Sequence, residues 1–226
     1  MVRLFLILAI LASLTACAGV SQMREEVRRS VSTAANPSVR VENTVGGVRV
    51  TVSSKHEVDV DAIKSGSSAD DLRNILVDVQ SQGGTVTITT KYRNFASGGV
   101  RYAISVPAGA SLNVDNATGA VNVEGVEGDV TAATQTGEIV ADLGRVAGRR
   151  AVDLSATTGS VRLIIDPASD ATVDARSVVG DFKSDFPGLS VDRENVVGSR
   201  ASGKIGGGSA SIRLNTTAGA IALRRS

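Results

Sequence analysis

The chain has 226 residues, with 24 basic and 23 acidic side chains, one histidine and one cysteine. This even balance of charge excludes the basic surface that nucleic-acid binding needs to displace phosphate counterions. Zinc sites need several His or Cys ligands and a disulfide needs two cysteines, so the sequence excludes both within the chain. We therefore expect no cofactor, no bound metal and no nucleic-acid partner.

The first sixteen residues are typical of a secretory signal peptide. Arg3 is followed by an apolar run from Leu4 to Leu14, which is too short to span a bilayer as a permanent helix. Small residues then lead to Cys17. We predict that residues 1–16 direct export and are removed, which leaves a mature chain with 23 basic and 23 acidic side chains.

The segment Leu14-Thr15-Ala16-Cys17 resembles the bacterial lipobox. This resemblance implies that Cys17 is acylated, with fatty acids such as palmitate, and becomes the N-terminus of a membrane-anchored lipoprotein. Ala18 follows the cysteine, and the absence of Asp there resembles outer-membrane sorting in Gram-negative bacteria. The alternative is an ordinary signal peptide in which the cysteine occurs by chance.

Residues 17–37 are polar and are predicted to form a lipidated tether, with at most a short helix. Arg24, Arg28 and Arg29 lie close to Glu25 and Glu26 in this segment. Next to an acylated end, the arginines could contact anionic lipid headgroups, at about 1 kcal/mol each. The simpler interpretation is a solvated spacer.

Residues 38–226 form the predicted repeat domain. One twelve-residue pattern, apolar-x-apolar-x-small-x-x-Gly-x-apolar-x-apolar, occurs six times, with a degraded fifth copy. The copies start at Val39, Leu112, Val130, Val152, Val173 and Ile212. The glycines at positions 119, 137 and 159 lie 18 and 22 residues apart, whereas Gly219 lies 39 residues after Gly180. Such repetition predicts a stacked repeat architecture.

Each copy is predicted to form a strand, a corner and a second strand. Alternation places apolar residues on one face and polar residues on the other, so that Leu112 and Val114 face inward while Asn113 and Asp115 face outward. Glycine at the corner allows a positive φ without a Cβ clash. One unit cannot bury its own apolar face, but stacked units can. We expect an all-β fold, a parallel β-solenoid with coils of about 20 residues.

Residues 51–111 carry strands without the repeat pattern and are predicted to form a less regular β layer near the N-terminal end of the solenoid. The expected strands cover residues 57–63, 76–80, 85–90 and 100–106. Gly83-Gly84 is typical of a hairpin turn, and the stretch after Ser68 is the best helix candidate. Residues 183–198 are expected to be a loop inserted before the last copies.

Taken together, residues 38–223 resemble a bacterial family of secreted β-strand-repeat proteins described as adhesin candidates, a domain family of unknown function. The resemblance rests on VENTVGGVRV, ISVPAGASLNVDNATGAVNVEGVEGDV, and SDFPGLSV followed by GKIGGGSASIRLNTTAGAIALR. It implies a β-solenoid exported to the cell envelope, sometimes with a lipid anchor. The family offers no established catalytic residues to carry over.

Few residues suggest catalytic chemistry. A serine triad needs a base, and His56 is the only histidine, at a strand end that suits solvent exposure. Residues 198–204 match the phosphate-binding loop pattern up to Lys204, but Ile205 replaces the magnesium-binding Ser or Thr and no helix is expected to follow. We interpret that match as chance and expect that the protein is not an enzyme.

Carboxylates leave one alternative open. Parallel β-helices can host polysaccharide-cleaving enzymes whose acidic residues gather on one outer face, whereas the outward charges here are scattered and of mixed sign. Asp59, Asp61, Asp70 and Asp71 form a denser acidic group that could bind calcium weakly, although the glycine-rich nonapeptide of calcium-binding coils is absent. A solvated edge is the simpler interpretation of this group.

The best candidate for a contact surface is the stretch KYRNFASGGVRY. Recognition of peptides and carbohydrates often uses aromatic side chains, and three of the five aromatic residues that remain after signal removal lie in this stretch. The predicted contact residues are Tyr92, Arg93, Phe95, Arg101 and Tyr102. The alternative is that these aromatic side chains pack on the core of the irregular layer.

We therefore predict a non-catalytic envelope protein that Cys17 anchors to a bacterial membrane, the outer one if the sorting resemblance holds. Its rigid solenoid surface would serve adhesion, scaffolding or the binding of an unknown envelope protein or glycan. The alternative is an enzyme that acts on envelope polysaccharide through carboxylates on a solenoid face. The sequence leaves open the ligand, the oligomeric state, and whether the domain faces the periplasm or the medium.

Overall fold

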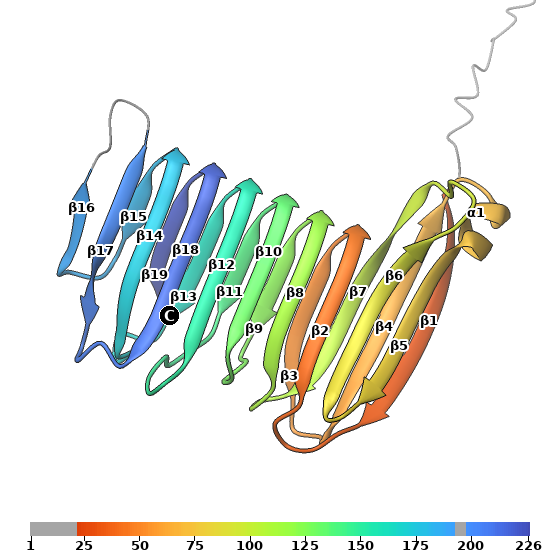
Figure 1. The fold of residues 1–226 in the computed structure, drawn as a ribbon, viewed down its shortest axis with the longest axis horizontal. Coiled ribbons are helices and arrows are strands. Elements are labelled where there is room, and N and C mark those ends of the chain that lie inside the picture. Colours follow the sequence, from red (N-terminus) through yellow and green to blue (C-terminus); the bar gives the residue numbers. More distant parts are fainter. Residues whose placement is uncertain (1–21, 193–197) are drawn as a thin grey trace, which may run out of the picture.

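The computed structural model describes residues 22–192 and 198–226. Cys17 and the predicted signal peptide lie outside the described residues. The described chain is almost entirely β-strand, arranged as two long sheets stacked face to face, with one short helix at one end (Figure 1). This confirms the predicted all-β class with long parallel sheets. No helix in residues 22–192 or 198–226 is long and apolar enough to cross a membrane.

Each repeat copy forms two strands joined at a glycine corner, as predicted. The first strand of each pair belongs to a ten-stranded sheet and the second to a nine-stranded sheet. The pairs are β2 (Ser38–Val45) with β3 (Val48–Ser53), β8 (Ser111–Thr118) with β9 (Val121–Glu124), β10 (Val130–Thr136) with β11 (Ile139–Asp142), β12 (Ala151–Thr158) with β13 (Val161–Ile165), β14 (Ala171–Val179) with β15 (Phe182–Ser184), and β18 (Ala210–Ala218) with β19 (Ile221–Arg225).

Neighbouring repeat strands are parallel and in register. In the ten-stranded sheet Val130 lies between Leu112 and Val152, so equivalent repeat positions stand side by side. The inward apolar residues therefore form continuous rows between the sheets, and Val114 and Leu154 are completely buried. This burial confirms the inward and outward faces predicted from alternation.

The order of the copies in space differs from their order along the chain. β18 lies between β12 and β14, and β19 lies between β13 and β15 (Figure 1). The register consequently steps by 22 residues from Val130 to Val152, but by 60 residues from Val152 to Ile212. The last copy is therefore inserted inside the stack, and a step of about 20 residues links only its central copies.

The layer without the repeat pattern covers the N-terminal end of the stack, as predicted. β6 (Thr85–Tyr92) extends the ten-stranded sheet beside β2, and β7 (Gly98–Pro107) extends the nine-stranded sheet beside β3. β5 (Ile75–Gln82) forms an antiparallel hairpin with β6, and β4 (Glu57–Gly66) pairs antiparallel with β7. Helix α1 (Ala69–Asn74) begins after Ser68, whose hydroxyl oxygen accepts a hydrogen bond from the Asp71 backbone N–H at 3.1 Å.

The predicted tether over residues 17–37 is wrong for Met23–Ser32. These residues form β1, which pairs antiparallel with β4 at the edge of the nine-stranded sheet. The Arg28 guanidinium lies 2.6 Å from a Glu26 carboxylate oxygen and 3.3 Å from an Asp61 carboxylate oxygen. Backbone pairing and charges on the adjacent strand thus hold a segment whose own sequence has little apolar pattern.

The predicted loop over residues 183–198 is wrong in part, because it contains the end of β15 and all of β16 (Leu189–Asp192). β16 pairs antiparallel with β17 (Ser199–Ile205), which in turn pairs antiparallel with β14. The residues that match a phosphate-binding loop therefore lie almost entirely in the extended strand β17. An extended strand does not form the loop that surrounds a phosphate, so the match is a chance one.

The corner glycines form a close-packed column. Their φ angles lie between +122° and +155°, which confirms the predicted left-handed corners at Gly46, Gly119, Gly137, Gly159, Gly180 and Gly219. The structure adds a second requirement. A Cβ added to Gly159 would overlap the carbonyl oxygen of Gly137 in the adjacent copy, and the other corners likewise meet a neighbouring backbone carbonyl. The corners therefore stack backbone on backbone.

Replacing a corner glycine should cost more stability than its φ angle alone implies. We expect Gly159→Ala to lower the free energy of unfolding by about 3 kcal/mol or more, because it adds a backbone overlap to a disfavoured φ of +144°. Denaturant unfolding measures this loss.

Gly144→Ala is the matched control. Gly144 also has a positive φ, of +57°, but nothing lies within 4 Å of an added Cβ. Its cost should therefore stay near 1–2 kcal/mol, as for a left-handed residue in open space. Equal losses in the two variants would contradict the requirement for backbone stacking.

Candidate functional site

The five predicted contact residues do not share one surface. The prediction is wrong for Tyr102, whose side chain on β7 is fully buried, with its hydroxyl oxygen 2.7 Å from Thr90 Oγ1. Arg101 is exposed, because successive residues of a strand point to opposite faces. For Tyr102, the alternative of packing on the core is confirmed.

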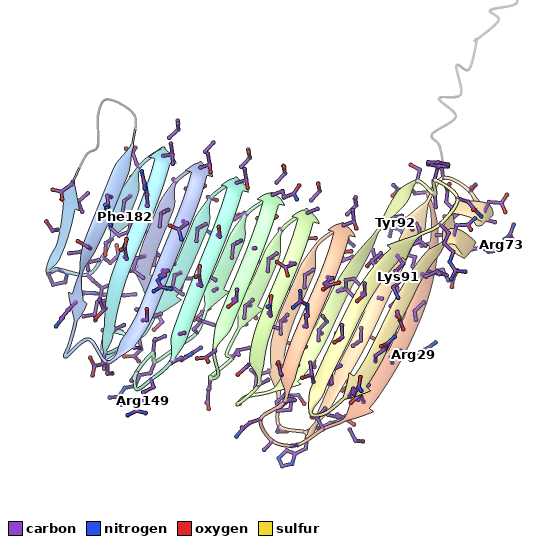
Figure 2. The ribbon with its side chains drawn as sticks, viewed as in Figure 1. Arg29, Arg73, Lys91, Tyr92, Arg149 and Phe182 are labelled. Carbon is purple, nitrogen blue, oxygen red and sulfur yellow. The ribbon has the colours of Figure 1, made fainter. Side chains whose placement is uncertain are left out.

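Tyr92 lies at the end of the molecule that carries α1 (Figure 2), and Arg93 and Phe95 follow it closely in the sequence. Tyr92 ends β6 and packs partly against the core, and its hydroxyl donates a hydrogen bond to the Gly98 carbonyl at 3.4 Å. Arg93 and Phe95 are exposed in the loop between β6 and β7. This loop and Arg101 are the parts of the predicted contact surface that remain open to solvent.

The other residues singled out in the sequence do not converge on one site. His56 is exposed in the turn between β3 and β4, as its strand-end position predicted. Asp59 and Asp61 lie on β4, whereas Asp70 and Asp71 belong to α1. Within the described ranges, no group of three or more His, Cys, Asp or Glu side chains could hold a metal ion.

Sequence reasoning missed a shallow groove on the outer face of the ten-stranded sheet, here called the outer groove. It crosses the carboxyl halves of β6, β2, β8, β10 and β12. Small side chains hollow its centre, and longer polar ones surround them: Ala117, Ala133 and Ser155 are the small residues, and Glu42, Thr44, Asp115, Gln135 and Thr157 are the polar ones. The sequence signal for this groove was the presence of alanine or serine at outward repeat positions. These residues belong to different copies, and only the stacking order of the copies places them side by side.

Two carboxylates stand next to the β6 end of the outer groove. Glu42 and Asp115 are register neighbours on the parallel strands β2 and β8. The Arg40 guanidinium lies 2.8 Å from Glu42 Oε1 and 3.7 Å from Asp115 Oδ2, so both carboxylates are engaged in ion pairs. Carboxylate oxygens retain further acceptor sites, and this end of the groove can therefore accept hydrogen bonds from a polar ligand.

Beneath the floor of the outer groove, a column of buried polar side chains occupies the fifth repeat position and points between the sheets. Asn116 is 3% exposed, and its amide donates to the carbonyl oxygens of Gly46 and Gly119 at 3.1 and 2.9 Å. Four other side chains at this repeat position each donate a hydrogen bond to the carbonyl oxygen of a corner glycine: Asn43, Thr134, Ser177 and Thr216. These bonds satisfy buried corner carbonyls and so fix the floor of the groove.

Tyr102 ends this polar column at the N-terminal layer. The Thr90 hydroxyl donates to Asn43 Oδ1 at 3.0 Å, so the Tyr102 hydroxyl acts as the donor to Thr90. The Asn43 amide donates in turn to Asn116 Oδ1 at 3.1 Å. Burial raises the pKa of the Tyr102 hydroxyl to about 12. The column therefore connects the irregular layer to the first repeats through neutral hydrogen-bonding groups.

The sequence of residues 104–224, more than half of the chain, matches the family described as Toastrack DUF4097. The chain belongs to the Toastrack DUF4097 family. This confirms the resemblance predicted from the repeat blocks. The Toastrack segment contains five of the six repeat copies and three of the five strands of the outer groove, β8, β10 and β12.

Solved structures resemble this Toastrack protein in fold at low sequence identity. A crystal structure of a candidate cell adhesion protein from Clostridium sporogenes aligns over 90% of this chain and 100% of its own, with a TM-score of 0.70 and 12% identity. A candidate adhesin from Bacteroides fragilis covers 89% of this chain and 97% of its own, with a TM-score of 0.29 and 15% identity. The first score shows a shared fold, whereas the second is too low to do so. The search of curated proteins gave no match.

The buried Tyr102 hydroxyl should make the Toastrack protein sensitive to alkali. Below pH 10 the phenol is neutral in both the folded and the unfolded chain, so its contribution to the free energy of unfolding is fully present. Between pH 10 and 12 the unfolded chain releases its proton first, because the folded pKa is raised to about 12. We expect the free energy of unfolding to fall by about 2–3 kcal/mol across this interval, as measured by denaturant unfolding at each pH.

Tyr102→Phe should flatten that alkaline decline, although it also removes the hydrogen bond to Thr90 and lowers stability at neutral pH by about 1 kcal/mol. The control is Tyr92→Phe, which leaves Tyr102 in place and should keep the decline. An undiminished decline in Tyr102→Phe would rule out the phenol as its cause.

Proposed function

We propose that this protein is a non-catalytic, lipid-anchored protein of the bacterial cell envelope. In this proposal, a β-solenoid with coils of about 20 residues displays the outer groove to an envelope glycan or protein partner. Acylated Cys17 attaches it to a membrane, the outer membrane by the lipobox context. The fold is a rigid support for adhesion or scaffolding, because its binding face is built from paired strands rather than from loops.

The observation that carries this proposal is the form of the outer groove. Small side chains lie between polar ones across five neighbouring strands, so the groove is long, shallow and lined with hydrogen-bonding groups. Strands repeat at about 4.8 Å, which is comparable to the length of one sugar unit in a polymer. A linear polar ligand laid across the strands would meet hydrogen-bonding groups on successive strands.

The relatives supply modest support. The Clostridium sporogenes protein with the shared fold is named as a candidate for cell adhesion. Adhesion is compatible with a surface that offers many weak, repeated contacts, since these add when several sites engage together.

An enzyme that acts on envelope polysaccharide is the second candidate, and the observation that favours it is the pair Glu42 and Asp115. They occupy register positions on β2 and β8, next to the β6 end of the outer groove. Glycoside hydrolysis needs two free carboxyl groups on either side of the bond that is cleaved. Here both carboxylates are paired with Arg40 on the same strand face, and this favours a binding role.

Filling the outer groove should abolish binding without unfolding the protein. Ala133→Arg places a long side chain at the hollow centre, and we expect it to reduce the fraction of protein that sediments with purified peptidoglycan sacculi by about tenfold, equivalent to 1.4 kcal/mol. Ala103→Arg is the matched control, because Ala103 is exposed on β7 in the other sheet. Equal sedimentation of the two variants would contradict a role for the groove, and hydrolysis of the sacculi would favour the enzyme.

Loss of the acylated cysteine should release the protein from membranes. We expect Cys17→Ala to move the protein from the membrane fraction to the soluble fraction of broken cells, because in this proposal the lipid on Cys17 attaches the protein to the membrane. Flotation with membranes measures this shift. A Cys17→Ala protein that still floats with membranes would contradict the lipoprotein assignment.

A further inference from the structure

Exposed apolar side chains gather where the described chain begins. Of eight large hydrophobic residues exposed among the described residues, four lie at the α1 end of the molecule: Met23, Val45, Ile63 and Phe95. Val45 and Ile63 line one cavity together with Gln22, and Met23 is the next residue of the chain. We call this group, with its flanking arginines Arg24, Arg93 and Arg101, the anchor corner. It lies at the opposite end of the stack from β16 (Figure 1).

Phe95 is the most exposed member of the anchor corner, with a side chain as open to solvent as in an extended peptide. The loop that carries it is tightly held. The Arg93 backbone N–H donates to the Asn74 carbonyl at 2.9 Å, and the Asn94 amide donates to Asn74 Oδ1 at 3.0 Å. Asn94 and Phe95 both have positive φ, at +50° and +55°, a conformation that is disfavoured for a bulky residue. The backbone thus projects the phenyl ring outward.

The N-terminal end of the described chain lies beside this loop. Gln22 lines one cavity with Gly66, Ser67, Ser97 and Gly98, which include the residues that follow Phe95. Five residue steps separate Gln22 from Cys17, and a fully extended chain covers at most about 18 Å in that number of steps. An acyl chain on Cys17 would therefore enter the bilayer within that distance of the anchor corner.

The charges around the apolar residues suit a lipid surface. Arg24 and Arg101 line the same cavity as Val45 and Ile63, and Arg93 lies two residues before Phe95. An aromatic ring beside arginines is the combination found at the boundary between headgroups and acyl chains, where the ring is amphipathic and the guanidinium meets phosphate. A protein partner is less favoured, since a small apolar corner next to the lipid attachment leaves little area for one.

We propose that the anchor corner rests on the membrane beside the acyl chain of Cys17, with Phe95 placed in the headgroup–acyl boundary. This proposal rests on the proposed lipidation of Cys17. One acyl attachment alone leaves the domain free to rotate about its linker, whereas a second contact fixes one end of the stack against the bilayer. The outer groove would then be held at a defined orientation to the membrane.

The test uses the full chain, processed and acylated in a Gram-negative host and reconstituted in vesicles of phosphatidylethanolamine with a minor fraction of phosphatidylglycerol. Ser97→Cys places a thiol two residues from Phe95, and Ser190→Cys is the matched control on exposed β16. An environment-sensitive dye labels only the introduced thiol, because the Cys17 sulfur is acylated. We expect the dye at position 97 to shift to shorter wavelength and to be quenched by spin-labelled lipid, and the dye at position 190 to do neither.

Phe95→Asp in the Ser97→Cys background should return the dye to water while the protein still floats with the vesicles. Dyes at positions 97 and 190 that both remain in water, or that both enter lipid, would overturn the proposal while leaving the anchor intact. A Ser97→Cys dye that stays in lipid after Phe95→Asp would overturn the role of Phe95. A protein that does not float would overturn the lipid anchor itself, and with it the proposal.

Discussion

The close approach of backbone to backbone at the glycine corners is the constraint on which the rest of the structure depends. A carbonyl oxygen of one copy occupies the place that a Cβ of the next would take, so the corners can stack at strand spacing only if each lacks a side chain. That spacing brings equivalent strands into parallel register and aligns the apolar rows between the sheets. It also turns corner carbonyls inward, where buried amides and hydroxyls must satisfy them.

The same constraint explains why a polar column can run through an apolar core. Each amide or hydroxyl at the fifth repeat position is buried next to a carbonyl that would otherwise lack a partner, and so its burial is compensated. Ala156 interrupts the column, since it has no group to donate. The ion pairs on the outer faces, such as that of Arg40 with Glu42, are half exposed and contribute little to stability by comparison. The rigidity of the outer groove therefore comes from the backbone beneath it.

Much of the fold could be predicted from the sequence because the repeat pattern encodes local geometry. Alternation fixed which side chains face inward, and glycine at one position located each corner. The spatial order of the copies could not be predicted, because six similar patterns are equally good neighbours for one another. The outer groove was missed for the same reason, since Ala117, Ala133 and Ser155 belong to different copies. Strand β1 was missed because cross-strand pairing, rather than its own apolar pattern, holds it in the sheet.

Tyr102 illustrates a different limit. In the sequence it belongs to a run of aromatic and basic residues that is typical of a contact surface, but strand alternation places it inward and Arg101 outward. The alternation rule was sufficient to separate the two, whereas the composition of the stretch was not. The alternation rule does not apply to Phe95, because this residue lies in a loop with left-handed backbone, where no periodicity determines the direction of a side chain.

The insertion of β18 and β19 inside the stack has a consequence for how the protein is made. Strands β12 and β14 do not pair with each other, so only the last copy joins the strands before residue 166 and the strands from β14 to β17 into continuous sheets. Synthesis from the N-terminus makes this copy last. Until it pairs with both blocks, their strand edges stay open to pairing with other chains. Protection of these edges, or rapid synthesis of the last copy, would matter more for this protein than for a solenoid stacked in chain order.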